Sequence, residues 1–293
     1  MLPFSILHAP SVLGLKPSGV DRLPDALRTA GLHDALGGSF EGSVAAPPFD
    51  SRRDPKTLLL NPFAIQEYSR RLAEEVGRIV RTDRLPVVLG GDCSILIGNL
   101  LALRRMGRYG LFFIDGHADF YLPEVEPNGE VASMDLALVT GRGPGVLADL
   151  DGLKPLVRDE DTVVFAYRDA VQAERDGSPD VRQSRMLVLS LEDVRQLGVR
   201  TAATTALAWL LEKPIGGFWI HLDADVLDDA VMSAVDYRMP GGLSPEDLAG
   251  ALSVLVSSGR VVGLDVTIFN PNLDPEGTGA RSLTNVLVKG LVG

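Results

Sequence analysis

Three short motifs hold the residue types that can bind metal ions or carry out hydrolysis. They are Gly-Gly-Asp-Cys-Ser at 90–94, Asp-Gly-His-Ala-Asp at 115–119 and Asp-Ala-Asp at 223–225. In an extended segment, alternate side chains point to one side, so those of Asp115, His117 and Asp119 can meet at one point, as can those of His221, Asp223 and Asp225. Together they offer one thiol, one imidazole and four carboxylates as donors: Cys93, His117, Asp115, Asp119, Asp223 and Asp225.

Six such donors can hold two divalent ions if two of the carboxylates bridge the ions. Burying four carboxylates without cations would cost more than the roughly 5–15 kcal/mol by which a domain is stable. The single-motif alternatives are ordinary: an isolated Asp-x-His-x-Asp can be a solvated turn, Cys93 a small buried hydrophobe and His221 a satisfied strand residue. Because all three motifs follow predicted strands, we favour a metal site.

The elements that must position these motifs are buried strands. Parallel sheets bind ligands at the carboxyl ends of their strands, and apolar runs rich in Val, Ile and Phe precede all three motifs. Such runs predict strands at residues 4–7, 87–89, 111–114, 163–166, 187–189, 218–222 and 261–266. Apolar residues at spacings of three and four predict helices between them, at residues 64–80, 95–105, 202–211, 245–257 and 282–291. The alternation of the two predicts an α/β fold with a parallel sheet.

Composition limits the remaining possibilities. The 293 residues carry a net charge of −11, which disfavours nucleic acid as a partner, and no apolar run approaches the roughly 18 residues of a membrane helix. Cys93 is the only cysteine and the N-terminus does not resemble a secretion signal, so we expect a cytoplasmic protein. Residues 37–55, with three Pro and three Gly, are interpreted as a surface loop within one domain.

The motifs resemble those of the arginase and agmatinase superfamily, the ureohydrolases. That pattern is GGDHS, DAHxD, SxDxDxxDP and DVxExNP, and here GGDCS, DGHAD, HLDADVLDD and DVTIFNP occur in the same order. PGGLS at 240–244 also fits, and GVDRLPDALRTAGL at 19–32 is similar to the family's opening helix. The likeness therefore spans nearly the whole chain.

The resemblance implies one three-layer α/β/α domain over residues 1–293, with an eight-stranded, mainly parallel sheet and two Mn²⁺ ions. It implies that Cys93 and Asp119 bind the first ion, that His117 and Asp225 bind the second, and that two carboxylates bridge them. The bridging residues would be Asp115 and Asp223. A hydroxide between the ions would attack a guanidino carbon of a small-molecule substrate and cleave a C–N bond.

Three departures from the family pattern bear directly on the chemistry. Cys93 replaces a histidine, and because a thiolate is a softer ligand than imidazole, Zn²⁺ or Fe²⁺ becomes an alternative to Mn²⁺. Ile268 stands where the family has the glutamate that pairs with the substrate guanidinium. Ala132 stands where a loop histidine of the family shuttles protons. Glu130 and His221 are the side chains that we consider as replacements for this proton donor, although His221 is favoured to lie deeper and to hydrogen-bond a metal ligand instead.

Two of these departures together shift one negative charge within the site. The Cys93 thiolate adds a negative charge beside the ions, and the absence of glutamate at position 268 takes away the negative charge that would pair with the substrate's guanidinium. Such a site suits a guanidine that is weakly basic and can enter uncharged. An N-hydroxyguanidine is weakly basic, and its oxygen offers a further acceptor to the metal or the protein. The chain thus resembles a cysteine-ligated subgroup that converts Nω-hydroxy-L-arginine to hydroxyurea and L-ornithine in the biosynthesis of the antibiotic D-cycloserine.

Further expectations follow from the resemblance. Tyr121, Glu126 and Asn128 belong to the loop that binds the substrate carboxylate in arginases, and Glu174 could bind the α-amino group of the substrate.

Other family activities remain alternatives: arginase, agmatinase, guanidinobutyrase or formimidoylglutamase. A catalytically inactive, metal-binding homologue is the alternative from another class. The last predicted helix ends close to Gly293, without the extension through which arginases form trimers or hexamers, so we expect a monomer.

Overall fold

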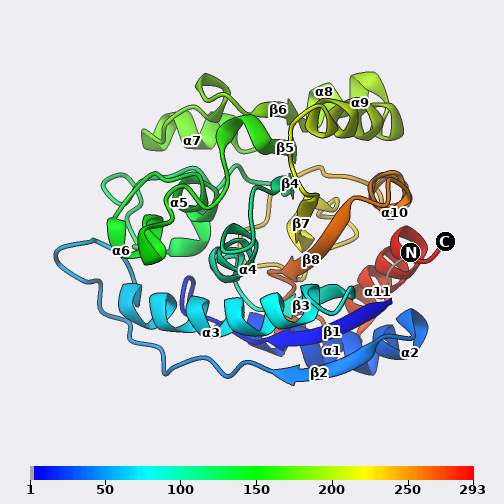
Figure 1. Cartoon of the computed structure of the whole chain (residues 1–293), viewed down its shortest axis with the longest axis horizontal. Coiled ribbons are helices and arrows are strands. Elements are labelled where there is room, and N and C mark those ends of the chain that lie inside the picture. The colour runs from blue at the N-terminus through cyan, green and yellow to red at the C-terminus, as the bar shows by residue number, and fades with distance from the viewer. Residues whose placement is uncertain (1–2) are drawn as a thin grey trace.

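The computed structural model describes residues 3–293. Its eight strands form one parallel sheet (Figure 1). The order of the strands across the sheet is β2-β1-β3-β8-β7-β4-β5-β6. Their bounds are β1 Phe4–Ala9, β2 Ser39–Ser43, β3 Leu85–Gly90, β4 Gly110–Ile114, β5 Thr162–Tyr167, β6 Leu187–Ser190, β7 Phe218–Asp223 and β8 Val261–Thr267. Every residue of β1, β3, β4, β5 and β7 is buried, which explains why their sequences are apolar on both faces.

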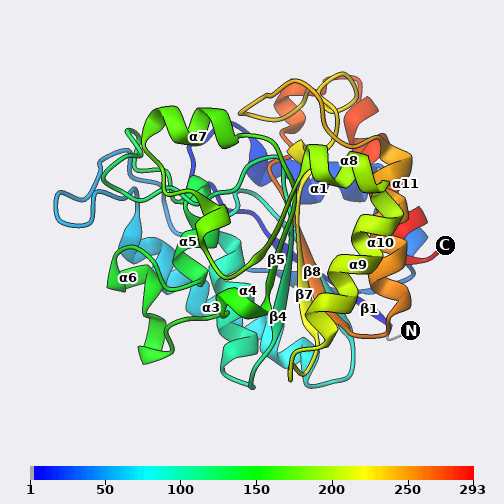
Figure 2. The same ribbon diagram turned by 90° about the horizontal axis from the view of Figure 1, so that it is seen from above.

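Helices cover both faces of the sheet, so the molecule has three layers (Figure 2). One face carries α3 Pro62–Val80, α4 Ile95–Arg104, α5 Asp135–Val139 and α6 Gly145–Ala148, with α7 Ala170–Asp176 near its edge. The other face carries α1 Leu23–Thr29, α2 Leu32–Leu36, α8 Leu191–Leu197, α9 Val199–Leu211, α10 Pro245–Ser257 and α11 Thr278–Leu291. Each layer has its own apolar core against the sheet. In residues 3–293, no helix combines the length and the apolar character needed to cross a bilayer.

The α/β prediction is confirmed, and the sheet is parallel throughout. All seven strands predicted from apolar runs are present, but the interpretation of residues 37–55 as a loop alone is wrong. These residues contain β2, an edge strand whose sequence Ser-Phe-Glu-Gly-Ser is exposed or only partly buried. Because an edge strand needs no apolar side chains on both faces, its sequence carries no strand signal.

Strand register brings the three motifs to one edge of the sheet. Leu89 of β3 pairs with Val266 of β8, Val266 pairs with Leu222 of β7, and Leu222 pairs with Ile114 of β4. The motifs begin immediately after these paired residues. Four adjacent strands therefore end at the same level, and the chain folds directly from them into the loops that carry the donors.

Gly91, in the first motif, is needed for the close approach of two backbones. A Cβ atom at this position would lie 1.8 Å from the carbonyl oxygen of Ser11, whereas one at Gly145, the first residue of α6, would meet no atom within 4 Å. We expect Gly91→Ala to lower the free energy of unfolding by about 3 kcal/mol or more, because backbone must move. Gly145→Ala is the control and should change it by less than about 0.5 kcal/mol. Urea denaturation of both variants measures the difference; equal midpoints would contradict the argument.

Candidate metal centre

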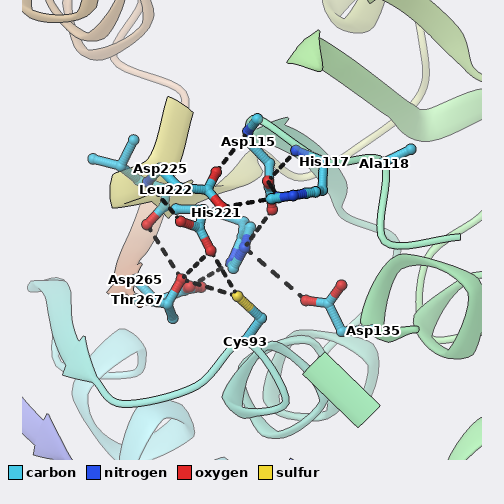
Figure 3. A network of polar contacts seen from close by, with 12 residues as sticks. Cys93, Asp115, His117, Ala118, Asp135, His221, Leu222, Asp225, Asp265 and Thr267 are labelled. Atoms are coloured by element: carbon cyan, nitrogen blue, oxygen red, sulfur yellow. Dashed lines mark hydrogen bonds and ion pairs between the residues drawn. The ribbon is translucent and has the colours of Figure 1, made fainter. Parts of the chain in front are cut away.

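The thiol of Cys93 lies at the start of α4 and contacts the end of β7. Its Sγ atom donates to Oδ2 of Asp223 at 2.9 Å and lies 3.3 Å from Oγ1 of Thr267 in β8 (Figure 3). All three side chains are buried. Burial, followed by the charges of Asp223 and Asp119, raises the pKa of the Cys93 thiol well above its usual range. A cation at this point would favour the thiolate, which is the form that binds metals.

The loop after β4 meets the loop after β7 through side chains of opposite charge. Nδ1 of His117 lies 2.8 Å from Oδ2 of Asp225. Backbone amides hold one oxygen of each neighbouring carboxylate: the amide of His117 donates to Oδ1 of Asp115 at 2.6 Å, and the amide of Asp225 donates to Oδ1 of Asp223 at 2.7 Å. Oδ2 of Asp115 is buried and has no hydrogen-bond partner among the described residues. These bonds fix the carboxylates and leave other oxygens available to a cation.

The loops after β4 and β7 are both held by Arg168 and Asp169, which directly follow β5. Arg168 donates to the carbonyl oxygen of Asp225 at 2.8 Å, and Oδ1 of Asp169 accepts from the amide of Ala118 at 3.1 Å. One residue pair therefore fixes the loops after both β4 and β7. This support keeps the candidate ligands in place, which a metal site requires of the groups around its ligands.

The donor set fits a pair of divalent ions. Donor atoms of His117, Asp115 and Asp225 lie within 4.8 Å of one another, as do those of Cys93, Asp119 and Asp135. Oxygen donors suit Mn²⁺, and the sulfur also suits Zn²⁺ or Fe²⁺. When bound, Cys93 and Asp119 would hold one ion and His117 and Asp225 the other, with Asp115 and Asp223 between them.

The electrostatics of the site also call for cations. Burial and the charge of Asp225 raise the pKa of Asp115 to about 6, and burial with Asp115 nearby raises that of Asp119 well above its usual range. Burial lowers the pKa of His117, but the charges of the Asp225 and Asp115 carboxylates outweigh the effect of burial. The net result is that the pKa of His117 is raised to about 10. Protons are thus retained where the carboxylates crowd together, and bound metal ions would replace them.

His221 belongs to a buried polar network beneath the donors. Its Nδ1 lies 2.6 Å from Oδ2 of Asp265, while Trp219 and Asn99 donate to Oδ1 of the same carboxylate. His221 is fully buried and does not line the cavity, so it is not placed to contact substrate. Asp135 has no hydrogen-bond partner on either oxygen among the described residues. The sequence gives no signal for Asp135, because this residue lies outside the three motifs and directly precedes an apolar run.

Five of the six candidate donors, all except Asp115, line a cavity of about 320 Å³, within the usual range for small-molecule sites. Tyr121, Glu126 and Asn128, the predicted substrate contacts, line this cavity, and so does Glu130, the predicted proton donor. Glu174 lines a neighbouring cavity instead, and α7 contributes Gln172 and Asp176 here among the described residues. The structure therefore does not bring Glu174 to this cavity. The two other departures from the family pattern, Ala132 and Ile268, also lie in the wall.

Residues 236–239 form a further part of the wall of this cavity. The hydroxyl of Tyr237 donates to Oε2 of Glu130 at 2.5 Å, and the ammonium of Lys16 lies 4.7 Å from the centre of the Tyr237 ring. Ser18 and Asn270 donate to Asp236 at 2.9 and 3.2 Å. No sequence motif marks this loop, because its residues are brought to the site only by tertiary contacts.

Outside the candidate metal ligands, Glu130 is the carboxyl group that we consider for holding a proton in the cavity. Burial raises its pKa, and the hydrogen bond from Tyr237 opposes that effect. If Glu130 supplies a proton, kcat/KM should fall as pH rises through this raised pKa, and Glu130→Gln should lose that limb of the profile and about 10²-fold in rate. Ser133→Ala, in the same cavity wall, is the control. An unchanged profile in Glu130→Gln would exclude this role.

Because the folded-state pKa of Glu130 is raised, its protonated form favours folding. The wild type should therefore lose stability, relative to Glu130→Gln, as pH rises from the ordinary glutamate pKa of about 4.3 through the raised value. Below the ordinary pKa the carboxyl is protonated in both states and this loss is absent. Denaturation midpoints of both proteins across this range test the sign.

Comparisons with known proteins give the family. The sequence profile of the Arginase family matches residues 3–292. Arginase from Bacillus caldovelox is 29% identical over 281 residues, covering 94% of this chain and 93% of that protein. Arginase from Staphylococcus aureus (strain MRSA252) is 28% identical over 277 residues, covering 92% of this chain and 90% of its own.

A solved structure agrees with the sequence comparisons. The structure of the Bacillus caldovelox arginase superimposes with a TM-score of 0.89 at 26% identity, over 100% of this chain and 99% of that one. The family profile covers the three loops that carry the donors as well as the strands that position them. This chain belongs to the arginase family.

Proposed function

We propose that this protein hydrolyses a C–N bond of a guanidino-type substrate with two divalent ions, most favourably Mn²⁺. The observation that carries the proposal is that five of the six candidate donors line one cavity, while donor atoms of the sixth, Asp115, and of His117 and Asp225 lie within 4.8 Å of one another. Backbone amides fix the carboxylates of Asp115 and Asp223. Bound ions would lower the pKa of a water and stabilise negative charge that develops at the substrate carbon. The arginase names of the related proteins support this class of reaction.

The preferred substrate is proposed to be Nω-hydroxy-L-arginine, giving hydroxyurea and L-ornithine. Cys93 adds a negative charge at the ions, and Ile268 offers no anion to a guanidinium in the cavity. Ile268 also has a φ of 68°, unfavourable for a β-branched residue, so the fold holds an apolar side chain at this wall at a cost of about 1–3 kcal/mol. A weakly basic hydroxyguanidine can enter uncharged and suits this distribution of charge.

The chain's own groups supply the proton and hold the amino-acid end of the substrate. Glu130 is proposed to protonate the leaving amine, the role left open by Ala132. Tyr121, Glu126 and Asn128 are proposed to contact the substrate. The hydroxyl of Tyr121 donates to Oδ2 of Asp176 at 3.0 Å, which holds that carboxylate at the cavity. Asp176 is therefore proposed to take the α-amino group in place of Glu174.

Other properties are proposed on the sequence alone. We propose one domain, a monomeric state and a cytoplasmic location, with no nucleic acid or membrane partner. Zn²⁺ or Fe²⁺ remains an alternative metal because of the sulfur ligand. Arginase activity is the second candidate function, and it is favoured by the names of the relatives that match over nearly the whole chain.

The test is a substrate panel on protein loaded with Mn²⁺, with products identified by mass. The panel contains L-arginine, Nω-hydroxy-L-arginine, agmatine, guanidinobutyrate and formimidoylglutamate. We expect hydroxyurea from hydroxyarginine at a kcat/KM at least about 10-fold above that for any other substrate, equivalent to about 1.4 kcal/mol. Urea from arginine at an equal rate would contradict the specificity. Full metal loading without turnover of any substrate would instead favour a binding protein.

A further inference from the structure

His221 replaces the serine of the family pattern and is the second imidazole at the candidate metal centre. The chain has four histidines, and the other two, His8 and His33, pair with each other through their Nε2 atoms at 3.1 Å. The His221 ring is fully buried and stacks on Phe113 with ring centres 4.6 Å apart. Its orientation is therefore fixed by packing as well as by hydrogen bonds.

Asp265 determines which nitrogen of His221 carries hydrogen. Its Oδ1 accepts hydrogen bonds from Trp219 and Asn99, and its Oδ2 lies 2.6 Å from Nδ1 of His221. A carboxylate that is held by two other donors acts as an acceptor, so Nδ1 donates to it. In the neutral ring Nε2 then has a free lone pair. A histidine held by a carboxylate in this manner has the arrangement usual for metal ligands.

The Nε2 atom points into the donor cluster and has no hydrogen-bond partner among the described residues (Figure 3). Donor atoms of His221, Cys93, Asp115 and Asp223 all lie within 4.8 Å of one another. Two ligands on opposite sides of one ion, each bound at about 2.1–2.3 Å, are separated by no more than about 4.6 Å. The four side chains thus lie close to the spacing that ligands of one ion require.

We propose that His221 binds, through Nε2, the same ion as Cys93, and that Asp265 is its positioning residue. The inference rests on the metal centre of the proposed function and adds a ligand to it. The family pattern has an imidazole at position 93 and a serine at position 221, whereas this chain has Cys93 and His221. The nitrogen ligand of this ion has moved from the loop after β3 to β7, and a thiolate occupies the vacated position.

A competing arrangement leaves His221 unbound to metal. Its Nε2 lies 4.0 Å from Oδ2 of Asp135 and 3.8 Å from Oδ2 of Asp115, so a protonated ring could balance these carboxylates. Both distances exceed hydrogen-bond length, and both carboxylate oxygens lack partners. If His221 is a metal ligand, its free Nε2 atom is bound to the ion. If His221 is a protonated counter-charge, no nitrogen of this ring is bound to the metal.

Pulsed electron paramagnetic resonance on Mn²⁺-loaded protein distinguishes them without substrate. In His117→Ala the imidazole of the other ion is removed, and His221 is the only imidazole left in the cluster among the described residues. We expect the nitrogen hyperfine coupling of a directly bound imidazole to persist in His117→Ala and to disappear in His117→Ala/His221→Ser. Mn²⁺-loaded His117→Ala without that coupling would overturn the inference.

Affinity measurements provide an independent test if His117→Ala binds metal poorly. Titration of Mn²⁺ into the otherwise native protein, followed by the resonance of the free ion, should show about 10- to 100-fold weaker binding of one ion in His221→Ser and in Asp265→Asn. Adding Cys93→His to His221→Ser should restore most of that affinity. His33→Ser, which removes a histidine paired with His8, is the control and should bind as the wild type does.

The outcomes separate this inference from the metal centre itself. If the wild type binds two Mn²⁺ and His221→Ser binds them equally well, only the role of His221 is wrong. If the wild type binds no Mn²⁺, Zn²⁺ or Fe²⁺, the metal centre and the proposed hydrolysis fall with it. Weakened binding in His221→Ser that Cys93→His fails to restore would also contradict the transfer of the nitrogen ligand.

Discussion

Replacing Cys93 by His and Ile268 by Glu together should turn the proposed preference for hydroxyarginine towards arginine. The double variant removes a negative charge from the ions and places one in the cavity wall where a guanidinium would lie. We expect the ratio of kcat/KM for the two substrates to change by about 100-fold, equivalent to about 2.7 kcal/mol. Steady-state assays of urea and hydroxyurea release measure this ratio.

The single variants show whether charge is the cause. Cys93→His and Ile268→Glu should each change the ratio in the same direction by a smaller factor, and Ile268→Gln, which adds a polar group without charge, is the matched control. An equal change in Ile268→Gln and Ile268→Glu would mean that shape or polarity, rather than charge, sets the preference. A double variant that stays selective for hydroxyarginine would refute the charge argument.

Asp223→Asn should abolish Mn²⁺-dependent hydrolysis while stabilising the metal-free protein. Asp223 is buried, and burial together with Asp225 and Asp115 raises its pKa well above the usual range. The metal-free fold must therefore either bury this charge or keep a proton on Asp223, and an amide requires neither, so we expect the free energy of unfolding without metal to rise by about 1–2 kcal/mol. Activity should fall by at least about 10³-fold, because the proposed bridging ligand is lost.

Thermal denaturation with and without Mn²⁺ measures both effects. The wild type should gain about 2.7 kcal/mol when the free ion is 100-fold above its dissociation constant, and Asp223→Asn should gain much less. Asp34→Asn changes an exposed carboxylate to the same amide and should behave as the wild type. If Asp223→Asn were less stable than the wild type without metal and still stabilised by Mn²⁺, its assignment as a ligand would be wrong.

Strands buried on both faces were predictable, because they leave continuous apolar runs. Phe218–Asp223 illustrates this, since burial on both faces demands apolar residues up to the point where the donors begin. By contrast, β2 at Ser39–Ser43 is held by backbone pairing to β1 at an exposed edge, and Glu41 and Gly42 are acceptable there. Its strand character depends on its neighbour and leaves no mark in its own sequence.

The donors of the site were predictable for a similar reason, since they follow those strands at fixed spacing. The surrounding residues were not. Asp135 reaches the donor cluster from α5, and Tyr237 reaches Glu130 across 107 positions of the chain. The choice between Glu174 and Asp176 depends on which side of the short helix α7 faces the cavity. Such relations are set by packing between elements, which spacing within one motif does not encode.

Optical titration of the metal-free protein with Co²⁺ tests directly whether the sulfur of Cys93 binds one of the two ions. We expect a near-ultraviolet thiolate-to-Co²⁺ charge-transfer band that grows until the ion at Cys93 is bound and is absent in Cys93→Ser. Binding of two Co²⁺ by the wild type without that band, or the same band in Cys93→Ser, would exclude Cys93 as a ligand.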